Sequence, residues 1–366
     1  MSTSDKICND GASKSNDDDG VCEVNDMLQN MTTADVVETT SVCANCGKEG
    51  SDINNTCNKC KSVMYCNAAC KKKHRHKHKN VCERIVAEKK ECERCAAELL
   101  HDEKLFKQPP PEEDCPICFL RMPILDTGRR YYACCGKMIC SGCINAPRYD
   151  NEGNEVDNQY CPFCRAQHPK TNEEEIKRNN KRMEAGDAMA MFNLGYYYAH
   201  GLYGSPQDYD KALGLWHRAG ELGFAESYYN IGNAYLQGNG VEVDKKKAIH
   251  YYELAAMKGD VTARQNLGSF EARAGNFDRA VKHYTIAASD GHSGSLRSMK
   301  IIYKEGNATK DDYAKALRAY QTYLDEIKSD QRDEAAAYDD DHKYLMIRYL
   351  SFSMVLSLYT QANNKC

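Results

Sequence analysis

Apolar and polar positions alternate with a helical period through the carboxy-terminal half of the chain, and the alternation itself repeats. Glycine recurs in the first amphipathic segment of each repeat at 37- and 36-residue spacing: Gly195, Gly232 and Gly268. The second segment carries an alanine and, four residues later, an aromatic residue: Ala212 and Trp216, Ala248 and Tyr252, Ala280 and Tyr284, Ala316 and Tyr320. Paired helices at this period predict an α-solenoid, and aromatic residues that recur in register are expected in its core.

The repeat motif narrows the type of solenoid. Three segments align with one another and resemble Sel1-like repeats, a type longer than the tetratricopeptide repeat: AMFNLGYYYAHGLYG, ESYYNIGNAYLQGNG and ARQNLGSFEARAGN. A fourth, less regular copy is expected from about residue 293 to 329, which gives an all-α domain of TPR-like helix pairs over 169–330. The resemblance implies a concave face that binds peptides or scaffolds protein complexes.

Residues 331–366 are expected to form a helical cap or tail. The stretch 344–360 is strongly apolar, but Arg348 and several serines interrupt it. Its 17 residues are marginal for spanning a bilayer. We expect a helix packed over the last repeat, with a weak membrane anchor as the alternative.

The amino-terminal segments differ sharply in charge. Residues 1–42 carry two lysines against nine acidic residues, a net charge of −7, although the whole chain carries only −4. Few large apolar side chains accompany these charges, so we expect a disordered acidic tail. Residues 43–108 carry fifteen basic against nine acidic residues, a net charge of +6. Residues 83–111, which overlap the end of this basic segment, are predicted to form a helical linker that ends in a run of three prolines.

Cysteine supplies the distinctive chemistry of the chain. Seven of the 20 cysteines lie in 43–82 and eight lie in 115–164, mostly as closely spaced pairs. Such pairs hold tetrahedral Zn²⁺, and four ions per chain would use fifteen thiolates and one imidazole. Unpaired thiols survive in reducing compartments, and the first 20 residues contain no apolar signal region. We therefore expect a multidomain cytoplasmic or nuclear protein with two small zinc-stabilised modules ahead of the solenoid.

The first cluster, in 43–82, closely resembles a MYND-type zinc finger. The resemblance implies two interleaved metal sites, formed by Cys43, Cys46, Cys66 and Cys70 and by Cys57, Cys60, His78 and Cys82. MYND modules typically bind short proline-containing peptides through a glutamine and a nearby tryptophan. Lys71 and Arg75 hold those two places here, which puts the usual peptide preference in doubt.

Basic residues crowd the last part of this finger, from Lys71 to Lys79. The favoured interpretation is the solvated face of a small helix that carries His78. A nuclear localisation signal and a nucleic-acid contact are the alternatives, and the second is disfavoured because no aromatic residues are interleaved for base stacking.

The second cluster, in 112–168, resembles a RING finger. The common RING histidine is replaced by Lys137, and the adjacent Cys134 supplies the missing thiolate. The resemblance therefore implies the all-cysteine variant, with one site formed by Cys115, Cys118, Cys140 and Cys143 and the other by Cys134, Cys135, Cys161 and Cys164. Structural zinc contributes on the order of 10 kcal/mol per site, so such a module can fold with almost no apolar core.

A RING finger implies a ubiquitin ligase that docks a ubiquitin-conjugating enzyme and positions its thioester-linked ubiquitin for attack by a substrate lysine. Ile117 and Pro162 match the positions that contact the conjugating enzyme, and Arg165 matches the non-covalent catalytic linchpin of many RING ligases. The alternative to a linchpin is an ordinary surface arginine. The region between Cys143 and Cys161 contains no tryptophan, where many active RING fingers place an apolar contact.

Two function classes remain after these observations. The lead hypothesis is a RING-type ubiquitin ligase whose MYND finger and repeats recruit protein substrates or peptides. The alternative is a non-catalytic adaptor in which both zinc modules bind proteins. Lysine methylation, which often accompanies MYND fingers, is discounted because no SET-like segment is visible. The sequence does not name the substrates, the conjugating enzyme or the oligomeric state.

Overall fold

The structure is a computed structural model that describes residues 41–50, 53–110, 113–124, 126–146, 159–338 and 343–344. The acidic segment expected to be disordered and the apolar stretch 344–360 lie outside the described residues, except at Ser41, Val42 and Tyr344. The chain divides into two compact units, Met1–Lys104 and Leu105–Cys366. Each unit is described by itself.

The first unit contains a two-stranded hairpin and most of one long helix. Strand β1 (Asn55–Thr56) pairs antiparallel with β2 (Met64–Tyr65), and helix α3 (Ala68–Phe106) follows over 39 residues. The middle of α3 is polar and exposed, and ion pairs between its own turns join Arg94 to Glu91 and Glu98 at 2.5 and 2.6 Å. Helix α3 runs without a break across residue 82. From the sequence, the finger was expected to end there and a separate helical linker to begin.

The second unit begins with a small module rich in cysteine. It contains the 3₁₀ turn η1 (Asp126–Gly128), the antiparallel strands β3 (Arg129–Tyr132) and β4 (Lys137–Cys140), and the short helix α4 (Ser141–Asn145). In the strand register Arg129 faces Cys140 and Tyr132 faces Lys137. The isolated bridge between Tyr160 and Gln167 closes the last loop of the module.

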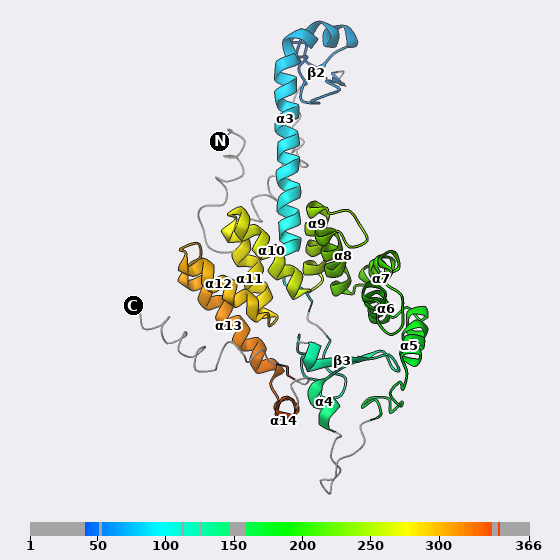
Figure 1. Ribbon diagram of the computed structural model, residues 1–366. Helices are drawn as coiled ribbons and strands as arrows, with labels where there is room; N and C mark the ends of the chain where they lie inside the picture. The colour runs from blue at the N-terminus through cyan, green and yellow to red at the C-terminus, as the bar shows by residue number, and fades with distance from the viewer. Residues whose placement is uncertain are drawn as a thin grey trace. The chain divides into compact units, whose positions relative to one another are not determined.

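In the described part of the chain, ten helices follow the cysteine-rich module, and all but the last of them stack into the solenoid (Figure 1). Their bounds are α5 Asn172–Glu184, α6 Ala188–His200, α7 Tyr209–Glu221, α8 Ala225–Gln237, α9 Lys245–Met257, α10 Val261–Ala274, α11 Phe277–Ser289, α12 Ser293–Lys304, α13 Lys310–Ile327 and α14 Asp330–Tyr338. Four consecutive pairs, from α6 and α7 to α12 and α13, pack as predicted, and α5 adds a helix before the first pair. The prediction of a helical Sel1-like solenoid is confirmed.

Polar residues fix where these helices begin. The aspartates Asp187, Asp208, Asp244 and Asp260 are N-caps whose carboxylates accept hydrogen bonds from backbone N–H groups of the first turn. Thr309 and Asp312 form a reciprocal capping box at the start of α13. Among the described residues no helix combines the length and apolar character needed to cross a bilayer.

The repeated glycines explain the repeated aromatic residues. A Cβ atom built on Gly195 would lie 2.6 Å from Nε1 of Trp216, and one built on Gly232 would lie 2.7 Å from the ring of Tyr252. Gly268 stands in the same relation to Tyr284. The ring of the second helix thus lies directly on the backbone of the first, and Tyr252 is completely buried there. The helices of each pair approach closely because this position has no side chain.

Replacing Gly232 by alanine should therefore destabilise the solenoid. The added methyl group must displace a buried ring, which costs about 1 to 3 kcal/mol, more than the roughly 1 kcal/mol that alanine gains in helix propensity. Gly214 is the matched control because it lies inside α7 with open space around its Cα. Gly214→Ala should raise the free energy of unfolding, as measured by urea denaturation followed by circular dichroism. Equal effects of the two substitutions would contradict this account.

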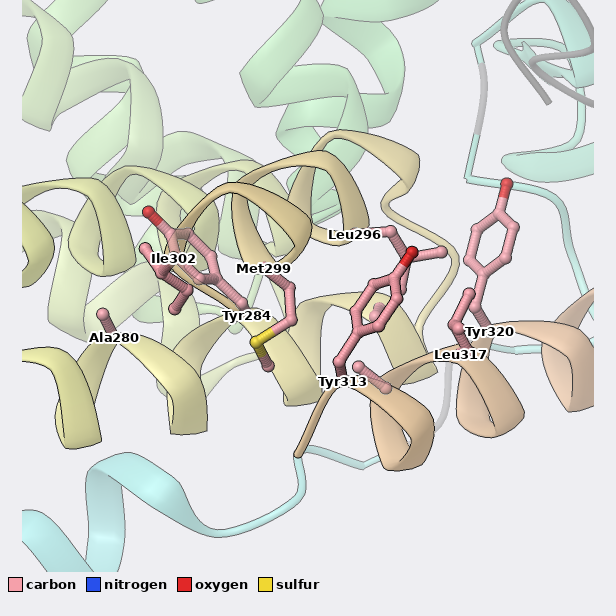
Figure 2. Close-up of a cluster of buried hydrophobic side chains, with 10 residues drawn as sticks. Ala280, Tyr284, Leu296, Met299, Ile302, Tyr313, Leu317 and Tyr320 are labelled. Carbon is pink, nitrogen blue, oxygen red and sulfur yellow. The ribbon is translucent and has the colours of Figure 1, made fainter. Parts of the chain in front are cut away.

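The fourth helix pair keeps the aromatic residue but packs it differently. Tyr320 lies in a buried cluster with Leu296, Met299 and Tyr313, and Tyr284 of the third pair belongs to the same cluster (Figure 2). Leu296 and Met299 of α12 supply aliphatic and thioether side chains to this cluster. The described glycine of α12, Gly294, lies against His292 and not against an aromatic ring of α13, so the glycine contact of the first three pairs is not repeated here.

Candidate metal centres

Four groups of thiol and imidazole side chains converge in the described part of the chain. The ligand atoms of each group lie within 4.8 Å of one another, and each group is named below by its first residue. They are the Cys43 site (Cys43, Cys46, Cys66, Cys70), the Cys57 site (Cys57, Cys60, His78, Cys82), the Cys115 site (Cys115, Cys118, Cys140, Cys143) and the Cys134 site (Cys134, Cys135, Cys161, Cys164). The structure brings together the same four sets that the sequence pattern groups, and their occupancy by zinc stays a prediction.

The sulfur positions fit a tetrahedral ion. Zinc–thiolate bonds of about 2.3 Å place the sulfurs of a tetrahedron roughly 3.8 Å apart. The observed Sγ–Sγ distances are 3.7 Å for Cys46 and Cys66, 3.6 Å for Cys57 and Cys82, 3.7 Å for Cys118 and Cys140, and 3.8 Å for Cys135 and Cys161. A disulfide would require about 2.05 Å. These groups therefore have the spacing of metal ligands.

The protonation of neighbouring thiols also favours a cation. A hydrogen bond from the backbone of Cys66 lowers the pKa of Cys43 to about 6, whereas the side chain of Cys70 raises the pKa of Cys66 to about 12. At the Cys115 site the side chain of Cys140 lowers the pKa of Cys115, and that of Cys115 raises the pKa of Cys143. One thiol of each site ionises readily, and its negative charge disfavours ionisation of the neighbouring thiols. A divalent cation would offset this repulsion and allow all the thiols of a site to ionise.

Side-chain amides support the Cys43 site. Asn45 and Asn67 donate hydrogen bonds of 3.4 Å to the sulfurs of Cys70 and Cys66. In the Cys57 site, Nε2 of His78 lies 3.2 Å from Sγ of Cys60. The ring of His78 stacks on His74, whose Nδ1 lies 3.2 Å from the hydroxyl of buried Tyr65. His74 thus acts as a packing residue rather than a ligand.

The basic residues of the first module have two different environments. Lys71 is half-buried, and its ammonium donates to the carbonyl oxygen of Thr56 at 2.5 Å and to Asn58 at 2.6 Å. Arg75 is exposed. The lysine at the glutamine position of a MYND finger is therefore engaged in holding α3 against β1, which leaves only the exposed face of the helix for other partners.

A tight hairpin turn explains how two adjacent cysteines serve the same site. Cys134 and Cys135 lie in the turn between β3 and β4, where the backbone N–H groups of Cys135 and Gly136 both donate to the carbonyl of Tyr132 at 3.2 and 2.8 Å. Gly136 has a φ of +69°, which a glycine adopts without strain. The turn delivers both sulfurs to Cys161 and Cys164, with 3.4 Å between those of Cys134 and Cys164.

Four of the CxxC segments, those that begin at Cys43, Cys57, Cys115 and Cys161, end in the same backbone geometry. The N–H of the residue after the second cysteine donates to the carbonyl of the first cysteine, and the φ of that residue lies between +56° and +73°. The residues are Gly47, Lys61, Phe119 and Arg165. Only the first is glycine, so the other three hold a left-handed conformation that their side chains disfavour. The loop around the metal site thus fixes the backbone from which Arg165 projects.

The predicted contact residues for a conjugating enzyme lie on two of these loops. Ile117 is 37% exposed, Pro162 is partly buried, and Arg165 is exposed. Two apolar side chains that the sequence interpretation did not single out accompany them: Phe119, 76% exposed, and Phe163, 44% exposed. Ile144 lies in the region between Cys143 and Cys161 that contains no tryptophan, and it is buried in the core of the module. Residues 147–158 of the same region lie outside the described residues.

The second module packs against the solenoid at both of its ends. Near the first helices, the hydroxyl of Tyr131 donates to Asp187 at 2.8 Å, and Arg129 pairs with Glu226 at 3.1 Å. Near the last helices, Arg121 pairs with Asp290 at 3.0 Å and Glu326 at 2.6 Å. α14 lies against α4, and its Ala336 also packs against Tyr323 and Ile327 at the end of α13. The sequence contains no signal for these contacts, because their partners lie far apart in the chain.

A cavity of about 690 Å³ lies between the second module and part of the solenoid, and residues of both line it. Its apolar lining comes from Met189, Phe192 and Tyr196 of α6, with Leu222 and Phe224 after α7. Tyr196 and Leu222 are 43% and 57% exposed. The cavity therefore presents apolar side chains to solvent beside the Cys-rich loops.

Comparison with known proteins identifies two segments. The model of the MYND finger family matches residues 43–82, and that of the Sel1 repeat matches 188–224, 225–260 and 267–292. Neither of these matches covers the second cysteine module. The first module is thus a MYND finger with the capacity to bind zinc, and residues 188–292 of the solenoid contain Sel1 repeats.

The curated relatives resemble this chain over limited stretches. Chitin synthase regulatory factor 4 of Schizosaccharomyces pombe is 29% identical over 128 residues, 35% of this chain and 20% of its own length. The Arabidopsis thaliana protein named "ERAD-associated E3 ubiquitin-protein ligase component HRD3B" is 34% identical over 105 residues, 28% of this chain and 16% of its own length. The matched stretch is thus at most a fifth of the length of either relative.

Among solved structures, a Sel1 repeat protein from Oxalobacter formigenes aligns over 61% of this chain and 86% of its own, with 21% identity and a TM-score of 0.37. The Escherichia coli antigen c5321 aligns over 51% of this chain and 40% of its own, with 26% identity and a TM-score of 0.35.

Proposed function

We propose that this chain is a RING-type ubiquitin ligase in which the second cysteine module docks a ubiquitin-conjugating enzyme. The observation that carries the proposal is the exposure of Ile117 and Arg165, with the partly buried Pro162, on two loops whose bases are metal-ligand sets. Phe119 and Phe163 extend this surface with apolar area. An apolar patch with one arginine beside it has the composition of a protein-docking site.

The chemistry of the proposed reaction belongs to the docked enzyme and its thioester. A substrate lysine amine attacks the thioester carbonyl, the amide bond forms, and the thiol of the conjugating enzyme leaves. Zinc in the module supplies rigidity to the loops. Ile117 and Pro162 bind the conjugating enzyme, and the planar guanidinium of Arg165 bridges it to ubiquitin and restricts the conformations of the pair.

The MYND finger and the Sel1 repeats support a role in recruiting proteins. The cavity beside α6 is where we place the partner segment, because exposed Tyr196 and Leu222 offer it apolar contacts next to the proposed transfer site. The printed name of the Arabidopsis relative refers to a component of a ubiquitin ligase, which agrees with this assignment.

A reconstituted ubiquitination assay tests the proposal. Full-length protein is mixed with activating enzyme, a panel of conjugating enzymes, ubiquitin and ATP, and self-modification or free chains are followed by blotting. Ile117→Ala should abolish chain formation, and Arg165→Ala should reduce its rate about tenfold or more, equivalent to roughly 1.4 kcal/mol of the barrier. Arg165→Lys should recover only part of the rate because it lacks the planar fork.

Lys61→Ala is the matched control for Arg165→Ala. Lys61 has a φ of 56° after a CxxC loop of the MYND finger, just as Arg165 has a φ of 61° in the second module. A cost arising from the left-handed backbone would appear in both variants, whereas loss of the linchpin affects only one. No activity with any enzyme of a broad panel, from protein with full zinc content, would reject the ligase assignment.

The second candidate function is a non-catalytic adaptor. Burial of Ile144 favours it, because the larger apolar side chain of the α4 segment is then not available in place of the tryptophan of many active RING fingers. An adaptor would bind conjugating enzymes weakly or not at all, yet would lose protein partners when Tyr196 and Leu222 are replaced by serine. Ubiquitin transfer and partner capture, measured on the same variants, separate the two functions.

A further inference from the structure

A fully buried arginine from the last described helix lies against the Cys115 site. Arg332 of α14 has no exposed surface, and its Nη2 lies 3.8 Å from Sγ of Cys118. Its Nη1 donates to the carbonyl oxygens of Arg121 at 2.9 Å and Ile327 at 2.6 Å. The guanidinium therefore bridges the second cysteine module, the end of α13 and a metal-ligand sulfur that is 214 residues away in the chain.

Among the described residues, no carboxylate forms an ion pair with Arg332, and its Nε has no hydrogen-bond partner. Two neutral carbonyl groups do not compensate a buried positive charge, which costs several kcal/mol when it is left without an anion. Within the same described residues, the thiols of the Cys115 site supply negative charge beside the guanidinium when they are ionised.

A ligand-loop glycine admits this arginine. A Cβ atom built on Gly142, between the ligands Cys140 and Cys143, would lie 2.9 Å from Cγ and 3.0 Å from the backbone nitrogen of Arg332. α4 and α14 are consequently in direct contact at the metal loop. The absence of a side chain at residue 142 is what lets the first turn of α14 reach the site.

We propose that Arg332 is a positioning residue for the Cys115 site and serves as the counter-charge of its metal-loaded form. Four thiolates and one Zn²⁺ carry a formal charge of −2, and the guanidinium is held beside them by two backbone carbonyls. Metal binding at this site and docking of α14 onto α4 therefore stabilise each other, because each supplies the charge that the other needs. The proposal rests on zinc occupancy of the Cys115 site and not on ubiquitin transfer.

The test measures zinc release from the full-length protein. Zinc content is determined by elemental analysis, and release into excess chelator is followed with a colorimetric indicator. Arg332→Met should speed the release of one of four zinc equivalents by about tenfold or more, the usual size of such outer-sphere effects. Arg332→Lys should restore much of the retention, because it keeps the charge. Gly142→Ala should act like Arg332→Met, because its methyl group displaces α14 without changing any ligand.

Arg318→Met is the matched control. Arg318 lies on α13 with its side chain 57% exposed, so its removal should leave all release phases unchanged. A cobalt-substituted sample adds a spectroscopic readout: in Arg332→Met the thiolate-to-cobalt charge-transfer band of one site should shift, which a loss of packing alone would not produce.

Three outcomes overturn the proposal. If Arg332→Met and the wild type release zinc at the same rate, Arg332 does not contribute to metal retention. Uniform acceleration of all equivalents, in Arg332→Lys as well as Arg332→Met, would show a general structural role. Wild-type protein with no more zinc than a Cys115→Ser variant would remove the metal on which the proposal depends, whatever the result of the ubiquitination assay.

Discussion

Replacing Cys115 by serine should unfold the second cysteine module and abolish ubiquitin transfer together. Cys115 is completely buried, and a serine hydroxyl does not ionise to replace its thiolate. Structural zinc contributes on the order of 10 kcal/mol per site, and the remaining core of the module is small. The expected result is loss of one zinc equivalent at least, measured by elemental analysis, and rapid proteolysis within 113–169.

Cys92→Ser is the control for that experiment. Cys92 is an exposed free thiol on α3 and belongs to none of the four sites. Its substitution should change neither the zinc content nor the proteolysis pattern. Retention of four zinc equivalents and a protected module in the Cys115→Ser variant would contradict the assignment of Cys115 as a ligand.

Leu105→Ala should destabilise the second unit by about 2 to 5 kcal/mol. Leu105 is completely buried among Tyr252, Ala256 and Leu267 of the solenoid. Its carbonyl oxygen accepts a hydrogen bond of 2.9 Å from the buried guanidinium of Arg264. The substitution should leave a cavity, because the hydrogen bond to Arg264 holds the backbone of residue 105 in place and prevents it from closing the space. Thermal unfolding followed by circular dichroism should show a lower midpoint.

Leu100→Ala provides the comparison for Leu105→Ala. Leu100 lies one and a half turns earlier in α3 and is 53% exposed, so its truncation should be close to neutral. Comparable losses at both positions would mean that truncation weakens the helix itself and that burial of Leu105 is not the cause.

The local patterns of the sequence predicted the local parts of the structure. Ligand spacing identified the sixteen metal-binding candidates, and the resemblance to MYND and RING fingers grouped them in the sets that the structure brings together. The recurring glycines and aromatic residues predicted the helix pairs, and the contact of Gly232 with Tyr252 explains why both recur. These features depend on residues within about 40 positions of each other, where chain geometry alone limits the possible arrangements.

Long-range contacts could not be predicted in the same way. Arg332 is one arginine among many in the sequence, and only the fold brings it to Cys118. Leu105 lies in the last turn of a mostly polar helix, shortly before three prolines, so no periodic pattern of apolar residues predicts its burial in the solenoid. A small helix that carries His78 and a helical linker after residue 82 were both predicted. Their union in one continuous helix was not predicted, because nothing in the local sequence distinguishes one long helix from two shorter ones.

The contact between Cys118 and Arg332 also imposes an order on biosynthesis. A ribosome that adds about 5 to 20 residues per second needs roughly 10 to 40 s to make the intervening chain. During that interval the cysteine-rich loops have left the exit tunnel while the arginine that covers them does not yet exist. Nascent chains of this protein therefore expose reactive sulfurs in every round of translation, and they depend on prompt metal delivery or on chaperones until the last helix emerges.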